Sequence, residues 1–297
     1  MLRLLPLATV VAATVIASAS ATPSPVAKVQ VGASSGLVLS GAGSIWTTDL
    51  VIPRVVRVDP STNAVVKRMK AGQKPFGLAY GARSLWVSDR VADRLTRLNP
   101  RTGRVQKRIR IGRSSYGLTF AAGSVWVTSE SDGTLRRISP KRNEVVKKIK
   151  AGTQPNGLAY AFGALWVADL GGHVLEVDVQ SNRVVARFAV PQADWITPSA
   201  DALWVSTEAN VVVKLDPSTG AVLARIPVGQ NPLASAWIAG ELWVPNIDDG
   251  TISVIDPSTN AVQTTFAVGQ QPLAVAENGG DAWVSSSFDG QLWRIHP

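Results

Sequence analysis

The sequence predicts an all-β protein, a seven-bladed β-propeller of four-stranded antiparallel blades. Tryptophan recurs at nearly constant spacing, with gaps of 40, 40, 40, 38, 39 and 40 residues. Periods of this length are typical of solenoids, propellers and repeat arrays. Each period also divides into four short apolar runs separated by Gly, Pro, Asn and Asp, which are strand and turn signals. The repeated residues are Trp46, Trp86, Trp126, Trp166, Trp204, Trp243 and Trp283.

The unit from Gly72 to Arg110 shows how one period is built. Its four runs are PFGLAYG (75–81), SLWVSD (84–89), DRLTRLN (93–99) and RVQKRIRI (104–111). They are rich in Val, Ile, Leu and aromatic residues, which favour strands, and each is too short for a typical helix. We therefore expect four sequential antiparallel strands in every unit.

The turn between the third and fourth strands recurs in six units. Its last residue is always Asn or Gly, and in five copies Pro occupies the second position. Asn and Gly tolerate a left-handed backbone, and Pro presets the second position of a type I turn. The six copies are DPSTN (59–63), NPRTG (99–103), SPKRN (139–143), DVQSN (178–182), DPSTG (216–220) and DPSTN (256–260).

The first two strands of each unit are apolar on both faces, as in Leu203-Trp204-Val205, whereas the fourth carries charge. Sheets whose inner strands are buried on both sides need neighbouring sheets on each side, which favours the radial arrangement of a propeller over a linear solenoid. The repeated tryptophans are accordingly predicted to be core residues, with ligand stacking as the alternative.

The two ends of the chain predict how the ring closes. The last unit supplies only three strands, PLAVAE (272–277), DAWVSSS (281–287) and GQLWRIH (290–296). The segment VAKVQVG (26–32) resembles a fourth strand and precedes SGLVLSG (35–41), the first strand of unit one. We expect 26–32 to complete the last blade, which would remove an open edge.

Residues 1–21 read as a signal peptide that precedes a single propeller domain over 22–297. Arg3 gives a positive start, 4–17 form an apolar run, and Ala19-Ser20-Ala21 is a small-residue cleavage site. The run is shorter than the roughly 20 residues that cross a bilayer, so we expect a secreted or periplasmic protein without a membrane span. There is no cysteine, which excludes disulfides and thiolate sites.

The segment DGTISVIDPSTNAVQTTFAVGQQPLAVA (249–276) and the repeated G-x-LWV resemble the bacterial YVTN-repeat propellers, which include periplasmic YncE-type DNA-binding propellers, and the related virginiamycin B lyase-like family. The resemblance covers nearly all of 22–297 and implies the propeller fold. The lyases of the second family use a metal, histidines and glutamate on one propeller face. This chain departs from that pattern, since its two histidines, His173 and His296, lie within predicted strands.

A ring of oxygen-bearing side chains follows the repeated tryptophans. Asp49, Asp89 and Asp169 stand three residues after their tryptophans, and Glu130 and Glu208 stand four residues after theirs. Five carboxylates at a channel mouth could hold Ca²⁺ or Mg²⁺. The alternative is that these residues begin turns. The sequence indicates no other cofactor, because it contains no phosphate loop, GxSxG elbow or clustered zinc ligands.

Loops leading into the first strand and loops between the second and third strands should share one face near the channel. An aromatic and basic mixture there could bind a glycan, a peptide or a single nucleic-acid strand, or could plug the channel. The candidate residues on this face are Lys74, Phe76, Arg90, Tyr116 and Trp195.

Charge is unevenly divided along the chain. Residues 31–150 carry a net charge of +16 and residues 151–297 a net charge of −9. The fourth strands of units one to three concentrate the basic residues, which predicts a footprint for nucleic acid or another polyanion. The candidate polyanion-binding residues are Lys67, Arg68, Lys70, Lys107, Arg108, Arg110, Lys147, Lys148 and Lys150.

Two interpretations of this charge compete. Lysine on an outermost strand also deters edge-to-edge aggregation, but that does not account for its restriction to three adjacent units. The basic units could also bind a protein partner, and the acidic units could dock a second copy head to tail, which leaves the oligomeric state open. We expect a non-enzymatic binding scaffold, with a virginiamycin B lyase-like or other metal-dependent enzyme acting at the channel mouth as the alternative.

Overall fold

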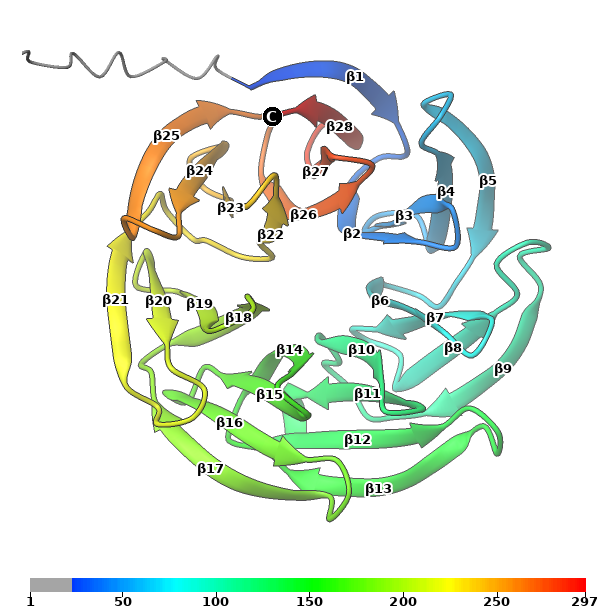
Figure 1. The fold of residues 1–297 in the computed structure, drawn as a ribbon. Coiled ribbons are helices and arrows are strands. Elements are labelled where there is room, and N and C mark those ends of the chain that lie inside the picture. Colours follow the sequence, from blue (N-terminus) through cyan, green and yellow to red (C-terminus); the bar gives the residue numbers. More distant parts are fainter. Residues whose placement is uncertain (1–22) are drawn as a thin grey trace, which may run out of the picture.

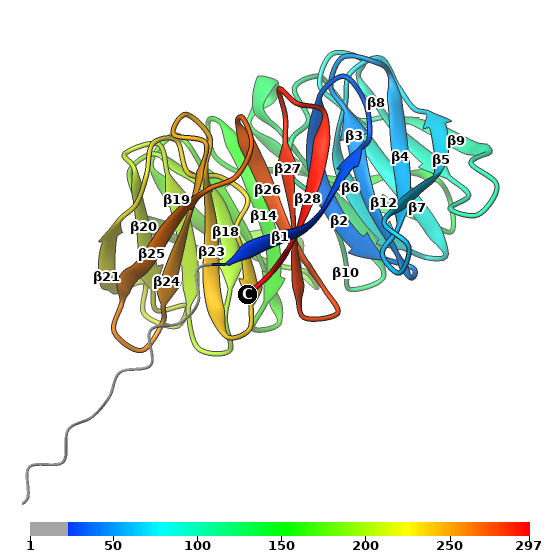
Figure 2. The same ribbon diagram turned by 90° about the horizontal axis from the view of Figure 1, so that it is seen from above.

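The computed structural model describes residues 23–297, which form seven four-stranded antiparallel sheets around one axis (Figure 1). The predicted signal peptide, residues 1–21, lies outside the described residues. Figure 2 shows the ring from the side, with the strands running between two faces that carry the loops. Within the described part of the chain, no helix has the length and apolar character needed to cross a membrane.

In the first four blades the strands follow one another from the channel outwards in chain order. Blade 1 contains β2 (Ser35–Gly41), β3 (Ser44–Asp49), β4 (Arg54–Asp59) and β5 (Ala64–Lys70). Blade 2 contains β6 (Pro75–Gly81), β7 (Ser84–Asp89), β8 (Arg94–Leu98) and β9 (Val105–Arg110). Blade 3 contains β10 (Leu118–Ala121), β11 (Ser124–Ser129), the 3-10 helix η1 (Glu130–Asp132), β12 (Thr134–Ser139) and β13 (Glu144–Lys150). Blade 4 contains β14 (Pro155–Ala161), β15 (Ala164–Asp169), β16 (His173–Asp178) and β17 (Arg183–Ala189).

The last three blades follow the same order except at the chain ends. Blade 5 contains β18 (Ala193–Pro198), β19 (Leu203–Thr207), β20 (Val211–Leu215) and β21 (Val222–Pro227). Blade 6 contains β22 (Ala236–Ile238), β23 (Glu241–Asn246), β24 (Thr251–Asp256) and β25 (Ala261–Ala267). Blade 7 contains β26 (Pro272–Asn278), β27 (Asp281–Ser286), β28 (Gln291–His296) and β1 (Ser24–Gln30). The predicted fold class, all-β with seven blades, is confirmed.

The turns between third and fourth strands have the predicted backbone. Their last residues all adopt positive φ, with Asn63 at 57° and Gly103 at 75° as examples. In five of the six turns the amide of this residue donates to the carbonyl of the first turn residue, as Asn260 does to Asp256 at 2.9 Å. Asn and Gly are used because other side chains crowd the backbone in this conformation.

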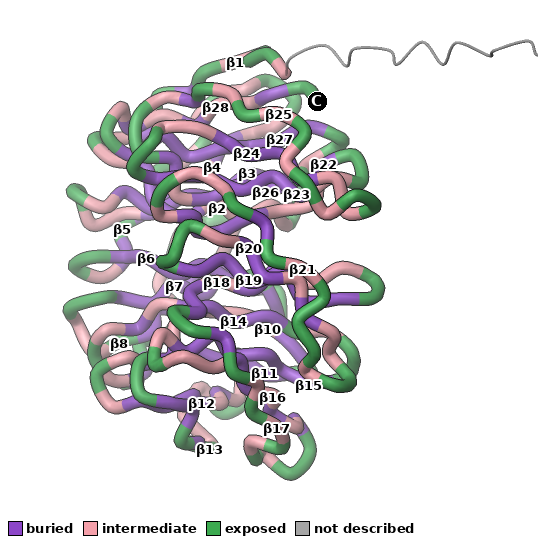
Figure 3. The backbone as a smooth tube through the Cα atoms, turned by 90° about the vertical axis from the view of Figure 1, so that its left-hand side faces the viewer, coloured by how far each residue is buried: buried purple, intermediate pink, exposed green. Residues whose placement is uncertain are grey.

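The seven repeated tryptophans form the core, as predicted. Each is at most 1% exposed and packs between neighbouring blades, and Figure 3 shows burial concentrated along the inner strands. Trp46, for example, lies in a cluster with Val55 and Met69 of its own blade and Leu85 of the next. Five of the seven indole nitrogens donate a hydrogen bond, four of them to the backbone carbonyl five residues earlier. Inner strands are therefore buried on both faces.

The first described strand closes the ring. β1 pairs antiparallel with β28, matching Val29 to Leu292 and Gln30 to Gln291, and the two strands lie side by side in Figure 2. The amide of Val31 continues the contact by donating to the Gly290 carbonyl at 2.9 Å. The prediction that the N-terminal strand completes the last blade is confirmed. The strand spans residues 24–30, two residues earlier than the predicted 26–32.

A cation from the third strand joins several blades to their neighbours. The Arg137 guanidinium lies 5.1 Å from the Trp126 ring centroid. It also donates to Ser124 Oγ of its own blade at 2.8 Å, and to Val179 O and Asn182 Oδ1 in the next blade's turn, both at 2.9 Å. We call this arrangement the seam clamp. Arg97, Lys214 and Arg294 make equivalent contacts to Asn143, Asn260 and Asn63.

The seam clamp depends on the Asn of the neighbouring turn. Where that turn ends in glycine the amide acceptor is missing. Arg57 still stacks on Trp46, at 5.5 Å, and bonds Ser44, but it faces the turn that ends in Gly103. In blade 4 the residue opposite Trp166 is Glu176, and the next turn ends in Gly220. The third-strand arginines 97 and 137 thus bond the neighbouring blade, whereas Arg57 bonds and stacks within its own blade.

Loss of one seam clamp should weaken the fold measurably. Arg137→Gln removes a cation–π contact and leaves buried acceptors in two blades, so we expect the free energy of unfolding to fall by about 1–3 kcal/mol. The control is Arg142→Gln, whose exposed side chain pairs with exposed Glu144 and should change stability by less than about 0.5 kcal/mol. Denaturant unfolding measures both, and equal effects would contradict the structural role of Arg137.

Candidate functional site

A central pocket of about 420 Å³ opens at one end of the channel. All seven blades contribute to it, through the starts of their first strands, the loops that precede these strands, and the loops between their second and third strands. Of the five predicted channel-face residues, Phe76, Arg90, Tyr116 and Trp195 line this pocket. Lys74 lines a neighbouring depression together with Arg90 and Tyr116. The structure therefore brings Phe76 and Trp195 to one pocket, although they are 119 positions apart in the sequence.

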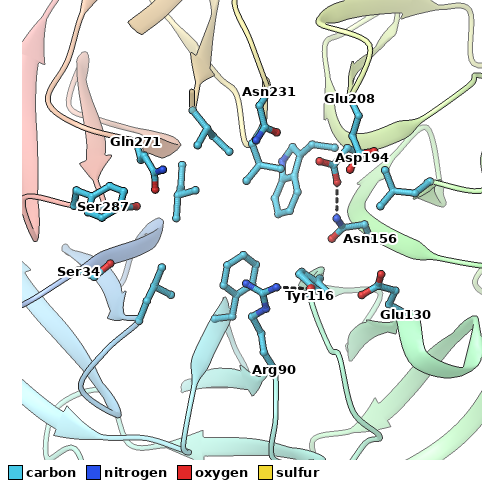
Figure 4. Close-up of a pocket in the computed structure, with 18 residues that line it drawn as sticks. Ser34, Arg90, Tyr116, Glu130, Asn156, Asp194, Glu208, Asn231, Gln271 and Ser287 are labelled. Carbon is cyan, nitrogen blue, oxygen red and sulfur yellow. Dashed lines mark hydrogen bonds between the residues drawn. The ribbon is translucent and has the colours of Figure 1, made fainter. Parts of the chain in front are cut away.

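One wall of the central pocket is aromatic and basic. The Phe76 and Tyr116 rings meet edge to face, with centroids 5.4 Å apart. The Arg90 guanidinium lies 5.0 Å from the Phe76 centroid and 4.5 Å from the Tyr116 centroid, and it donates to the Tyr116 hydroxyl (Figure 4). Arg90 is thus held on two rings by cation–π attraction and a hydrogen bond.

Trp195 separates the central pocket from the rest of the channel. It lines the pocket and also a second cavity of about 180 Å³, formed by later residues of the first strands such as Leu39 and Leu78. It packs on an apolar cluster that includes Leu37, Leu233 and Ala274. The sequence left two roles for the channel aromatics, ligand binding and plugging of the channel. Trp195 lies where either role is feasible, because it fills the channel and also forms the floor of the pocket.

The adjoining wall of the central pocket is acidic. It contains Asp194, at the start of β18, Glu208, after β19, and Glu130 in η1, as Figure 4 shows. Asp194 is 5% exposed, and its Oδ1 accepts a hydrogen bond of 2.5 Å from Asn156 Nδ2. Burial raises the pKa of Asp194 to about 7, and the charges of Glu208 and Glu130 add to the effect, while the Asn156 bond opposes it.

Asp194 was not predicted from the sequence. It occupies the position of Asn156 in the preceding blade, because Ala193 pairs with Thr207 as Pro155 pairs with Asp169. The repeat nevertheless contains a pattern that could have identified Asp194. Aligning first strands on their pairing partner places Phe76, Tyr116, Asn156 and Asp194 at one channel-facing position, but blade 5 lacks the Pro and Gly that mark this strand in blades 2 and 4.

The predicted carboxylates Asp49, Asp89 and Asp169 are buried and organise separate loops. Asp89 Oδ1 accepts the amides of Val91 and Ala92 at 3.0 and 2.7 Å, and Oδ2 accepts those of Gln73 and Lys74. Asp169 accepts the amides of residues 153 and 154 at 3.0 and 2.7 Å. Asp49 accepts three backbone amides and pairs with Arg54 at 3.0 Å.

Asp49 and Asp89 thus accept amides of the turns that they begin, which is the turn-forming alternative of the sequence. Asp169 instead accepts amides of the loop that precedes β14. Within residues 23–297, no three His, Cys, Asp or Glu side chains are grouped so as to hold a metal ion. Binding of Ca²⁺ or Mg²⁺ at the channel mouth stays a prediction.

Basic side chains gather on the outer strands of blades 1 to 3. In all three blades, like charges stand directly opposite one another across the outer strand pair. Lys67 is half-buried, and the other eight predicted residues are exposed. The like-charge pairs are Arg54–Lys70, Arg57–Lys67, Arg94–Arg110, Arg97–Lys107, Arg136–Lys148 and Arg137–Lys147. The outer strand pairs of the other four blades contain none.

A groove of about 430 Å³ lies within this surface, where blade 1 meets blade 2. Five cationic side chains line it, and Asp93 is the acidic residue among the lining residues. Asp93 pairs with Arg110 at 2.9 Å, which leaves a strong positive excess. We call it the basic groove, and its cations are Lys70, Arg94, Arg108, Arg110 and Arg113.

The basic residues of blade 3 are partly neutralised. Asp132 Oδ2 pairs with Arg136 at 2.5 Å and with Lys148 at 2.8 Å, and the Asp132 carbonyl accepts a bond from Lys150 at 3.2 Å. Burial opposes ionisation of Asp132, but Lys148, the Thr134 hydroxyl and Arg136 hold its pKa below the usual range. Free positive charge is therefore concentrated nearer blades 1 and 2.

Neither histidine belongs to the central pocket. His173 begins β16, paired with Asp169 on one side and Ala189 on the other. His296 ends β28, where its Nδ1 lies 2.8 Å from Asp281 Oδ1. The lyase-like alternative therefore receives no support from the positions of the histidines.

Comparison with known proteins supports the fold. The chain matches no family model and no curated protein. It is similar to a solved structure of Kuenenia stuttgartiensis hydrazine synthase, with a TM-score of 0.78 and 15% identity, over 91% of this chain and 97% of that chain. At this identity the likeness shows the propeller architecture alone. Membership of the YVTN-repeat or lyase-like families stays a prediction from the repeat motif.

Protonation of Asp194 should couple stability to pH. Its pKa is raised in the folded chain, so its contribution to stability is complete below about pH 4 and is lost as the pH rises towards about 7. Between about pH 5 and pH 8 we expect the parent protein to lose about 3 kcal/mol of unfolding free energy relative to Asp194→Asn. Urea unfolding at both pH values measures this.

The control for this prediction is Asp201→Asn, an exposed aspartate at the other end of blade 5. It should leave the pH dependence of the parent unchanged. A gap between the parent and Asp194→Asn that stayed constant across the pH range would contradict the assignment.

Proposed function

We propose that this protein is an exported, non-enzymatic propeller scaffold that binds a DNA-like polyanion through the outer strands of blades 1 to 3. The observation that carries the proposal is a set of exposed cations on these strands that form no ion pair within residues 23–297, namely Arg68, Lys70, Lys107, Arg108 and Lys147. Unpaired cations gathered on one surface attract a polyanion.

The shape of the basic groove supports the same conclusion. Three arginines, Arg94, Arg108 and Arg110, project from neighbouring strands into it, and Arg113 and Lys70 flank them. Guanidinium groups match phosphate and sulfate oxygens in pairs of hydrogen bonds. A chain of phosphates lying along the outer strands could place one of them in this groove.

Protection against edge-to-edge aggregation explains the restriction of basic residues to blades 1 to 3 less well than polyanion binding does. All seven blades have an outer strand with an exposed edge, yet β21 carries one basic residue and β25 none. A device against aggregation would be needed on every blade. The negative charge of residues 151–297 would instead repel a polyanion from the other blades and orient it towards blades 1 to 3.

Contacts of this kind would be made to phosphates and would therefore be largely independent of base sequence and sensitive to salt. The resemblance of the repeat to periplasmic YncE-type DNA-binding propellers agrees with this ligand class. It also agrees with export of the chain after cleavage of residues 1–21. A protein partner with an acidic surface is a different outcome that the same test would reveal.

The test is binding to double-stranded DNA, measured by fluorescence anisotropy over a range of salt concentrations. The test variant replaces five cations that form no ion pair within residues 23–297. We expect weaker binding and a shallower salt dependence, with the slope reduced by about 0.9 for each phosphate that the variant no longer neutralises. The substitutions are Arg68→Gln, Lys70→Gln, Lys107→Gln, Arg108→Gln and Lys147→Gln.

A matched control removes exposed arginines from the outer strands of blades 4 and 5. The substitutions Arg183→Gln, Arg187→Gln and Arg225→Gln should leave DNA binding unchanged. If the parent protein neither binds DNA nor is retained on heparin, or if the test variant binds as tightly as the parent, the proposed function is wrong.

A further inference from the structure

We infer that the central pocket is a binding site for a small organic amine, whose ammonium group would contact Asp194, Asn156 and Glu208 while its apolar body lies against Trp195. This ligand has the opposite charge to the polyanion proposed for the outer strands. The two sites therefore stand independently, and failure of one leaves the other untouched.

The first reason is a buried carboxylate without a cation. Asp194 is 5% exposed, lines the central pocket and forms no ion pair within residues 23–297. Buried carboxylates are normally paired or strongly hydrogen-bonded, because removing their charge from water is costly. Among the described residues that line the pocket, Arg90 is the single cation, and its side chain stacks on Phe76 and bonds Tyr116. Asp194 therefore lacks a counter-charge that a ligand could supply.

The second reason is an unused acceptor beside that carboxylate. Asn156 Nδ2 donates to Asp194 Oδ1, which sets the orientation of the amide. Asn156 Oδ1 is buried and accepts no hydrogen bond from any described residue. Buried acceptors are rarely left unpaired. A primary ammonium carries three donors, so one group could bond the amide oxygen, the Asp194 carboxylate and a further acceptor.

Glu208 provides the further acceptor. It lines the same side of the central pocket, as Figure 4 shows, and its negative charge is felt at Asp194. Its side chain is exposed, so it can move to meet a ligand at small cost. With Glu130 on the same wall, the acidic residues outnumber Arg90 by three to one, which disfavours an anionic ligand.

The apolar part of the lining selects an organic cation over a metal ion. Trp195, Leu233, Ile247 and Phe288 line the same pocket. Aromatic rings attract cations and cover apolar groups. The acidic residues are not grouped closely enough to coordinate a metal within residues 23–297. A volume of about 420 Å³ falls within the usual range of small-molecule pockets.

The test compares two probes of equal size by isothermal titration calorimetry. Phenethylamine carries an ammonium group at about pH 8.5, where Asp194 is also ionised, and 2-phenylethanol carries a neutral hydroxyl in its place. We expect the amine to bind at least about tenfold more tightly than the alcohol. Asp194→Asn and Glu208→Gln should each weaken amine binding by about tenfold or more.

Asp201→Asn serves as the control, because it removes an exposed carboxylate of the same blade at the other end of the channel. It should bind the amine as the parent does. Glu208→Gln keeps the test decisive if Asp194→Asn alters the fold, since Glu208 is exposed.

Three results would overturn the inference. The amine and the alcohol could bind equally, both variants could bind as the parent does, or Ca²⁺ or Mg²⁺ could displace the amine with the same dependence on Asp194 and Glu208. The last result would assign the acidic wall to a metal ion.

Discussion

The pairing of β1 with β28 is the constraint on which the rest of the structure depends. Every blade buries its inner strands against two neighbours, so no blade can stand at an end without exposing apolar surface and an unpaired edge. The first and last blades meet only if the chain ends are joined. The strand that begins the fold therefore completes the blade that ends it, and Trp283 packs with Val29, Val31 and Ile45 across the junction.

Closure also determines what the loops can do. Residues in corresponding loops recur about every 40 positions in the sequence, yet the ring places them around one pocket. Asp194 and Glu208 of blade 5 come together with Arg90 of blade 2 only because both blades face the same channel. The outer strands lie farthest from the channel, where each blade presents its own surface to solvent. A ring of this kind can therefore carry an acidic centre and a basic rim without either cancelling the other.

The sequence was sufficient for the fold and for part of the site. Strand positions, turn conformations and ring closure follow from local patterns, such as the Trp period and the Asn or Gly at residues 63 and 103. The shared face of Phe76, Arg90 and Tyr116 follows from the repeat once the fold is known. These features depend on spacing, which one sequence displays directly.

The remaining features depend on contacts between blades, which spacing does not display. Arg97 and Arg137 look like surface charge in the sequence, but the neighbouring turn's asparagine draws them into the seams. Asp89 looks like a metal ligand, although backbone amides occupy both of its oxygens. Asp194 is not predicted from the sequence because its blade lacks the Pro-x-Gly pattern of blades 2 and 4, and its burial comes from packing that no single repeat reveals.

Backbone hydrogen exchange under native conditions tests ring closure most directly. Amides of β1 and β28 that bond across the junction should be protected to the same degree as those of β27, because all three strands then belong to one cooperative sheet. Exchange in β1 and β28 as fast as in the exposed loops would show that the first strand does not hold the last blade. The ring would then not be closed by β1, and the account of the shared pocket would fail with it.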